Sequence, residues 1–321
     1  MKVYRNGKFT GVYDSSTHMN LFKILKWKLF SKDRTPFKQT TPPKPVHMPE
    51  KLMQKEDFIC WLSHASFLVQ LGRKRILIDP VFGDIPFYTR QIPFPYHAEE
   101  LGKIDFLLIS HVHYDHLDIL SIKAIESEKP KALLPLYMTS LIHRHVPSLQ
   151  TVELDWYESF EEEGLKITLV PAKHWGRRGL FDKNRTLWGG YILQHKGITI
   201  YFAGDTAKGD HFSEIGKRFD IDFALLPIGA YKPEFIMKHN HLNPQEAYDA
   251  FEQLGAKWMI PMHYGSYKLT DEPLDEPLQW MEQIAAEHPG RIRILKVGEV
   301  MVVQNETISN HGGTTYRQAN I

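Results

Sequence analysis

The feature that most constrains this chain is the six-residue run from His111 to His116, which reads His-Val-His-Tyr-Asp-His. It comes directly after Phe106–Ser110, an apolar stretch typical of a buried strand. Functional side chains collect where strands end and loops begin. Three imidazoles and a carboxylate crowded this closely need partners that offset the cost of burying them. The run therefore predicts a metal site, with zinc or a similar first-row metal suiting its ligands.

Three further residues occupy the same kind of position, each directly after an apolar strand pattern. They are His174, Asp205 and His263. Gly204, just before Asp205, allows a close approach of the backbone. Together with the first run these residues offer seven potential ligands, which is too many for one tetrahedral zinc ion. Two ions that share a bridging ligand would use about this number.

Composition excludes several other classes of protein. The 321 residues include 39 Lys and Arg against 38 Asp and Glu, a net charge of +1, so no basic excess favours a nucleic-acid partner. Cys60 is the single cysteine, so no intramolecular disulfide is available. The beginning of the sequence has no apolar signal region, and no uncharged stretch reaches the roughly 20 residues of a membrane-spanning helix. We therefore expect a cytoplasmic protein.

Residues 1–50 differ from the rest and are predicted to form an N-terminal extension to a main domain at 51–321. Within the extension, Leu21–Phe30 is apolar with interleaved lysines, and Thr41–Pro45 is a stiff, Pro-rich connector. Two interpretations of Leu21–Phe30 stay open. It is either a short helix packed on the main domain with its lysines reaching solvent, or a peripheral contact with a membrane surface. Because every candidate ligand lies after residue 110, residues 1–40 are expected to be dispensable for the site.

From Phe58 onward, short strand patterns follow one another closely. The early ones read as meanders, and the later ones alternate with helical patterns, Pro244–Leu254 and Leu278–Glu287. This mixture favours two β-sheets packed face to face over a doubly wound sheet. The expected strands are Phe58–Leu62, Ser66–Leu71, Arg75–Asp79, Asp105–Ser110, Ala132–Pro135, Leu165–Val170, Trp188–Gln194, Ile198–Ala203, Asp222–Ile228 and Trp258–Met262.

The histidine run, followed in order by His174, Asp205 and His263, resembles the metallo-β-lactamase superfamily over roughly Phe58 to Val302. Several local strings are similar to the branch that contains N-acyl-phosphatidylethanolamine-hydrolysing phospholipase D. These strings are WLSHAS at 61–66, IDPVF at 78–82, HW at 174–175 and HLNPQEA at 241–247. The ascorbate-phosphate lactonases are more distant relatives.

The resemblance implies an αββα sandwich, with two mixed β-sheets and helices on the outer faces. It also implies two divalent metal ions, zinc or alternatively manganese or iron. In that scheme His111, His113 and His174 hold the first ion, Asp115, His116 and His263 hold the second, and Asp205 bridges both. Spacing alone does not make this division.

Further roles follow from the same resemblance. Asp79 would lie beneath the metals and orient a ligand histidine, whereas a turn-capping role is the alternative. His64 either faces the site or is a hydrogen-bonded structural histidine. Asp115 would both bind metal and orient a metal-bridging hydroxide. His241 would contact the substrate and donate a proton or hydrogen bond during catalysis.

The function expected is hydrolysis of a phosphodiester in a small or lipid-like molecule, as in a phospholipase D. A lactone, another ester or an amide is the alternative substrate for the same metals. A binding or regulatory protein that keeps the fold without the chemistry is the alternative outside enzymes. Residue 113 is His where flavo-diiron members carry a carboxylate, which favours hydrolysis over electron transfer. A homodimer is expected because dimers are the commonest assembly.

Overall fold

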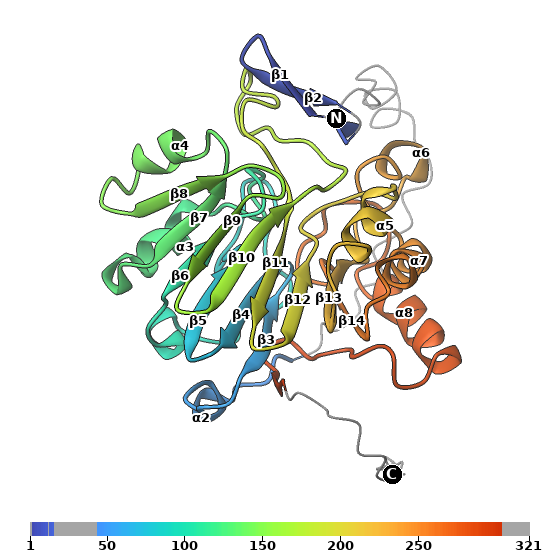
Figure 1. Ribbon diagram of the computed structural model, residues 1–321. Coiled ribbons are helices and arrows are strands. Elements are labelled where there is room, and N and C mark those ends of the chain that lie inside the picture. Colours follow the sequence, from blue (N-terminus) through green and yellow to red (C-terminus); the bar gives the residue numbers. More distant parts are fainter. Residues whose placement is uncertain (1, 12, 16–43, 304–321) are drawn as a thin grey trace.

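The computed structural model describes residues 2–11, 13–15 and 44–303. Two large β-sheets face each other, with α3 and α4 on one outer side and α5 to α8 on the other (Figure 1). The αββα sandwich expected from the sequence is therefore confirmed. A separate two-stranded sheet lies at one end of the molecule and consists of β1 (Lys2–Arg5) and β2 (Lys8–Gly11).

The first large sheet has seven strands in the order β15-β3-β4-β5-β6-β7-β8. Its first strands form an antiparallel meander, and β5 to β8 run parallel to one another. The strands are β3 (Phe58–Ser63), β4 (Ser66–Leu71), β5 (Lys74–Ile78), β6 (Phe106–Leu108), β7 (Lys131–Pro135), β8 (Gln150–Leu154) and β15 (Val300–Val302).

The second large sheet has six strands in the order β14-β13-β12-β11-β10-β9. Here β9 to β12 are antiparallel, whereas β12, β13 and β14 are parallel and are connected through helices. The strands are β9 (Ser159–Glu162), β10 (Leu165–Val170), β11 (Gly190–His195), β12 (Ile198–Phe202), β13 (Phe223–Pro227) and β14 (Trp258–Met262).

The helices are short, apart from two near the end of the described chain. They are α2 (Pro49–Leu52), α3 (Ile119–Ala124), α4 (Thr139–His143), α5 (His211–Gly216), α6 (Glu234–Met237), α7 (Pro244–Leu254) and α8 (Glu276–Glu287), with 3-10 turns at Ala98–Leu101 and Glu126–Glu128. Helix α7 begins as expected, because the Asn243 side chain accepts a hydrogen bond from the Glu246 amide at 2.9 Å and Pro244 occupies its first turn.

The first sheet is buried on both faces. Along β3, Ile59 and Trp61 belong to the core between the two sheets, whereas Phe58, Cys60 and Leu62 pack under α3 and α4. Successive side chains of a strand point to opposite faces, so a strand covered on both sides must be apolar throughout. This is why β3 and β4 appear in the sequence as continuous apolar runs, and why Cys60 is an ordinary core residue.

The N-terminal residues that the structure describes pack onto the sandwich. The Phe9 side chain is 1% exposed and belongs to the core between the sheets. Its backbone amide donates to the Asn184 carbonyl at 2.8 Å. Leu21–Phe30 lies outside the described residues, so neither interpretation of that segment is decided. The division at residue 50 stays a prediction.

Candidate metal centre

The candidate ligands all follow strands, and the strands come from both sheets. His111 to His116 follow β6, His174 follows β10, Asp205 follows β12 and His263 follows β14. Asp118 caps α3 by accepting from the Leu120 and Ser121 amides, which turns the chain away just after the run. The sandwich therefore brings the ends of strands that are far apart in sequence to one edge of the molecule.

Two backbone positions make this convergence possible. Gly204 has φ +61°, and a Cβ atom there would lie 2.9 Å from the Gly189 carbonyl oxygen and 3.0 Å from Ser110 Cβ. Glycine is therefore required before Asp205. His263 itself has φ +64°, an unusual conformation for a residue with a side chain. Strained positions of this kind collect at functional sites.

A first group contains His111, His113, His174 and Asp205, whose ligand atoms all lie within 4.8 Å of one another. His113 Nδ1 is 2.9 Å from His111 Nε2 and 3.1 Å from His174 Nε2. The Asp205 Oδ2 atom is 3.8 Å from the Nε2 atoms of both His111 and His174. Three ring nitrogens and one carboxylate oxygen therefore surround a common point.

A second group contains His64, Asp115, His116 and His263, and the other oxygen of Asp205 faces His116 and His263. Asp205 Oδ1 is 3.2 Å from His116 Nε2 and 3.0 Å from His263 Nε2. Asp115 Oδ2 is 3.7 Å and 3.4 Å from the same two nitrogens. The Asp205 carboxylate thus lies between the two groups and directs one oxygen to each.

The burial of these atoms fits a metal site. The side chains of His116, His263 and Asp205 are nearly inaccessible to solvent, yet His116 Nε2, His263 Nε2 and Asp205 Oδ1 make no hydrogen bond. Buried polar atoms without partners are costly. Two imidazole nitrogens and a carboxylate oxygen that face one another are the donor set that zinc and similar metals take. The residues present therefore fit a bound cation.

The pKa values of the candidate ligands are compatible with a bound cation. Burial, together with the neighbouring imidazoles, lowers the pKa of His111 and of His174 well below the usual value of 6.5, so both rings keep a free lone pair. Burial opposes ionisation of Asp205, but His116 and His263 outweigh it and hold the pKa of Asp205 well below the usual value. The carboxylates of Asp205 and Asp115 raise the pKa of His263 to about 9, against the effect of burial.

Asp79 lies beneath the second group, at the end of β5. Its Oδ2 atom accepts from His116 Nδ1 at 2.7 Å and from Ser110 Oγ at 2.5 Å, and its Oδ1 atom accepts from the Ser110 amide at 2.7 Å. With Nδ1 of His116 donating to Asp79, Nε2 is the ring nitrogen that faces Asp205 and would bind a metal. The carboxylates of Asp205 and Asp115 raise the pKa of His116 well above the usual value of 6.5 against the effect of burial, so a metal would displace a proton from Nε2. Asp79 is fully buried and contacts the ring of a candidate ligand, as expected of a residue that orients ligands.

His64 and His241 both lie at the site. His64 Nε2 is 3.1 Å from Asp115 Oδ2, and burial, followed by the effect of His263, lowers the pKa of His64 to about 3. His241 Nδ1 is 3.8 Å from Asp205 Oδ2, and His241 and His263 could hold a metal ion together with that carboxylate. Burial lowers the pKa of His241 to about 4. Both rings are therefore neutral near pH 7 and can donate a hydrogen bond without carrying a charge.

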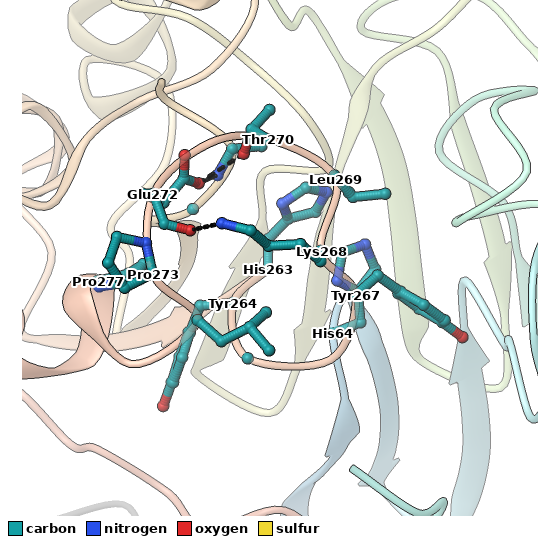
Figure 2. Close-up of a pocket in the computed structure, with 14 residues that line it drawn as sticks. His64, His263, Tyr264, Tyr267, Lys268, Leu269, Thr270, Glu272, Pro273 and Pro277 are labelled. Carbon is teal, nitrogen blue, oxygen red and sulfur yellow. Dashed lines mark hydrogen bonds between the residues drawn. The ribbon is translucent and has the colours of Figure 1, made fainter. Parts of the chain in front are cut away.

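The loop after β14 backs the site. Figure 2 shows this loop around a small cavity lined by His64, His263, Tyr264 and Tyr267, with the Lys268 amine donating to the Glu272 carbonyl. The cavity measures about 20 Å³, which is room for one water molecule and not for a substrate. The loop therefore supports His263 from behind and leaves its Nε2 atom facing Asp205 and Asp115.

Comparison with known proteins decides the family. Residues 74–264 match the model of the β-lactamase superfamily domain, and this range includes every candidate ligand. The chain belongs to the metallo-β-lactamase superfamily. Within it, the chain is 33% identical over 307 residues to N-acyl-phosphatidylethanolamine-hydrolyzing phospholipase D 1 of Caenorhabditis elegans, covering 88% of this chain and 86% of that protein.

A second curated relative agrees with this assignment, and a solved structure agrees with the fold. A metal-dependent hydrolase of Pelotomaculum thermopropionicum is 31% identical over 247 residues, which is 76% of this chain and 98% of that protein. The solved structure of Igni18, a metallo hydrolase of Ignicoccus hospitalis, superposes with a TM-score of 0.62 at 21% identity and covers 78% of this chain and 100% of its own. The two curated relatives are both named as hydrolases, so the chain is a metal-dependent hydrolase, and the alternative of a binding protein without chemistry is not supported.

Two contacts at the site have no local sequence signal. Ser110 Oγ donates to Asp79, which accepts from His116, and it also lies 2.9 Å from His111 Nδ1. One hydroxyl therefore connects the surroundings of His116 with those of His111. Arg178 donates to the carbonyls of Val112 at 3.1 Å and Leu117 at 2.7 Å, which are the two ends of the histidine loop. These contacts of Arg178 with the histidine loop can be identified only in the folded structure.

Proposed function

We propose that this hydrolase holds two divalent metal ions and cleaves a phosphodiester in a small or lipid-like molecule, in the manner of a phospholipase D. One observation carries the two-metal part. The Asp205 carboxylate is nearly buried, and its two oxygens face two different groups of histidines. A carboxylate placed this way would be suited to offer one oxygen to each of two ions.

The arrangement of the donor atoms supports the following division of the ligands. His111, His113 and His174 would hold one ion, and Asp115, His116 and His263 would hold the other, with Asp205 shared between them. The all-imidazole group and the mixed group suit zinc, with manganese and iron as alternatives. Two such ions would supply a water of lowered pKa as the nucleophile and would neutralise charge on the phosphate.

Two side chains, Asp115 and His241, would take part in this chemistry beside the metal ions. Asp115 accepts from His64 and stays ionised, so its second oxygen can accept a hydrogen bond from the attacking water and orient it. His241 is neutral and borders Asp205 without a hydrogen bond on Nδ1. Its ring N–H can donate to the oxygen that carries charge as the bond breaks. Asp115 and His241 are therefore the proposed catalytic side chains besides the metals.

The phosphodiester substrate rests on the relatives. The Caenorhabditis elegans relative is named for hydrolysing N-acyl-phosphatidylethanolamine, and the similarity covers most of both chains. Two clustered ligand groups also suit displacement at phosphorus, where one group serves the attacking oxygen and the other the phosphate. A lactone, another ester or an amide remains the alternative, since the same site can serve those bonds.

A lipid-like substrate would need contact with a membrane surface, and one described loop is suited to it. Asp182 accepts from the Arg178 amide at 3.1 Å and the Gly179 amide at 2.7 Å, and so closes a tight loop. The tip of this loop, Leu180 and Phe181, is 78% and 84% exposed. A loop held by hydrogen bonds that presents two large apolar side chains to water is suited to enter a lipid interface.

The charges around the loop favour an anionic surface. Arg177, Lys183 and Arg185 flank the apolar tip. The loop also touches the metal site, because Tyr114 of the histidine run donates to the Arg178 carbonyl at 3.1 Å and packs against its guanidinium. Peripheral membrane contact through this loop would bring a phospholipid headgroup close to the metals. Among the described residues, no helix is long and apolar enough to cross a bilayer.

The deciding experiment compares substrates. The purified protein, supplied with zinc or manganese, is assayed on a chromogenic phosphodiester, an N-acylated phosphatidylethanolamine, and a panel of lactones and amides. Turnover of the phosphodiesters with kcat/KM of about 10⁴ M⁻¹s⁻¹ or above supports the proposal. Turnover of lactones or amides alone would refute the phosphodiesterase function. The homodimer and the cytoplasmic location stay predictions.

A further inference from the structure

A segment near the start of the chain runs alongside the ligand His174. The backbone amide of His174 donates to the Tyr13 carbonyl at 3.1 Å, and the amide of Ser15 donates to the His174 carbonyl at 3.0 Å. These two bonds form a short parallel bridge centred on Asp14. The backbone of a candidate metal ligand is therefore fixed by residues that lie far outside the family-wide match at 74–264.

The Ser15 side chain extends this contact to the imidazole. Ser15 Oγ donates to Asn240 Oδ1 at 2.7 Å, and the Asn240 backbone carbonyl lies 3.1 Å from His174 Nδ1. All three residues are buried, with Ser15 at 0%, Asn240 at 4% and His174 at 1% exposure. A carbonyl can only accept, so His174 carries its proton on Nδ1. The lone pair is then on Nε2, which faces His113 and Asp205.

The orientation of the Asn240 amide depends on Ser15. Its Nδ2 atom donates to the Ile236 carbonyl at 3.3 Å, which leaves Oδ1 as the acceptor for the serine hydroxyl. Asn240 comes directly before His241, whose Nδ1 atom is 3.8 Å from Asp205. One buried hydroxyl thus holds a short segment that touches the site twice, through the carbonyl of Asn240 and through the ring of His241.

We propose that Ser15 is a positioning residue for the metal centre, and that it acts through Asn240 to fix the tautomer and orientation of His174 and the placement of His241. The inference rests on the metal centre of the proposed function but not on the choice of substrate. Outer partners that orient ligand histidines contribute strongly to metal affinity, because a ring fixed in advance loses less freedom on binding. Residues 13–15 are then part of the site, contrary to the expectation that residues 1–40 are dispensable for it.

The test measures zinc affinity and metal-free stability separately. Ser15→Ala removes the hydroxyl, and Thr168→Val is the matched control, since Thr168 is also buried and its hydroxyl bonds one side chain, Ser159, at 2.8 Å. Zinc affinity is measured by competition with a chromophoric chelator, and thermal unfolding is followed on the chelator-treated proteins. We expect both variants to unfold at slightly lower temperature, whereas only Ser15→Ala binds zinc roughly tenfold more weakly.

A second variant covers the case in which Ser15→Ala does not fold. Asn240→Ala keeps the backbone carbonyl and removes only the acceptor of the serine hydroxyl, so it should weaken zinc binding by a similar factor. The double variant should lose no more than either single one, and Ser15→Thr should recover most of the affinity. Zinc affinity equal to wild type in Ser15→Ala or Asn240→Ala, or an equal loss in Thr168→Val, would overturn the proposal. A wild-type protein that binds zinc but cleaves no phosphodiester would refute the proposed substrate alone.

Discussion

The role of Asp79 can be tested by a substitution that barely changes shape. Asp79→Asn keeps an oxygen that can accept from the Ser110 amide, but its NH₂ group faces His116 Nδ1, where the carboxylate accepted at 2.7 Å. Two donors cannot share that bond, so the imidazole must move its proton to Nε2. The Nε2 atom of His116 then has no lone pair for a metal. We expect zinc binding to weaken about 10- to 100-fold.

The effect on folding should be much smaller for Asp79→Asn than for Asp79→Ala. The alanine variant loses three accepted hydrogen bonds and leaves the Ser110 amide and His116 Nδ1 buried without partners. At about 1–3 kcal/mol for each of these two unsatisfied groups, this variant should lose about 2–6 kcal/mol of unfolding free energy. The asparagine variant should lose about 1–2 kcal/mol, because volume and at least one bond remain.

The matched control is Asp222→Asn. Asp222 is also buried and accepts from the Thr199 amide at 2.8 Å, but it precedes β13, at the opposite end of the parallel strands from the metal centre. Chelator competition gives zinc affinity, and denaturant unfolding of the metal-free proteins gives stability. Wild-type zinc affinity in Asp79→Asn, or an equal loss of affinity in Asp222→Asn, would refute the tautomer argument.

Three further predictions concern the substrate side, the protons and the surface. His241→Ala should lower kcat/KM by about 10²-fold or more while zinc content stays at the wild-type value; loss of zinc would make His241 a ligand instead. Because the pKa of His263 is raised to about 9 in the metal-free protein, zinc must displace a proton at pH 7. Zinc affinity should therefore rise between pH 7 and pH 9, and calorimetry in buffers of different ionisation enthalpy should detect released protons; a flat profile would contradict this. Replacing Leu180 and Phe181 by serine should weaken binding to anionic vesicles about tenfold or more. The control Phe87→Ser changes a 98% exposed residue in another loop and should leave vesicle binding unchanged. Wild-type vesicle binding by the Leu180 and Phe181 variant would contradict the assignment of this loop to a membrane surface.

The sequence predicts the buried apolar strands well, including the edge strand β14, and the partly exposed edge strands poorly. Strands β4, β10 and β14 and helix α7 have the expected bounds to the residue, because each is a buried apolar or amphipathic run with clear flanking signals. Strands β8, β9 and β15 were not expected, and they lie at the edges of the two large sheets. An edge strand such as β9, Ser-Phe-Glu-Glu, is half exposed and lacks the apolar run that marks a strand in the sequence.

The candidate site likewise has a part that the sequence predicts and a part that it does not. The candidate ligands stand out in the sequence because several histidines and carboxylates follow apolar strands, and the structure brings all of them to one edge. Their supports do not stand out. Ser15, Arg178 and Asn240 are common residue types in segments without a motif, and each gains its role from contact with a loop that is distant in sequence. Such contacts depend on the tertiary fold, which local patterns do not encode.

The proposed binuclear centre depends most on Asp205 serving two metal ions, and one titration tests this directly. Metal-free protein is titrated with zinc while bound metal and hydrolysis of a chromogenic phosphodiester are followed together, for wild type and for Asp205→Ala. We predict that wild-type activity reaches its maximum at two zinc ions per chain, and that Asp205→Ala loses affinity at both sites along with turnover. Full activity at one zinc ion per chain, or two tightly bound zinc ions in Asp205→Ala, would contradict the binuclear centre.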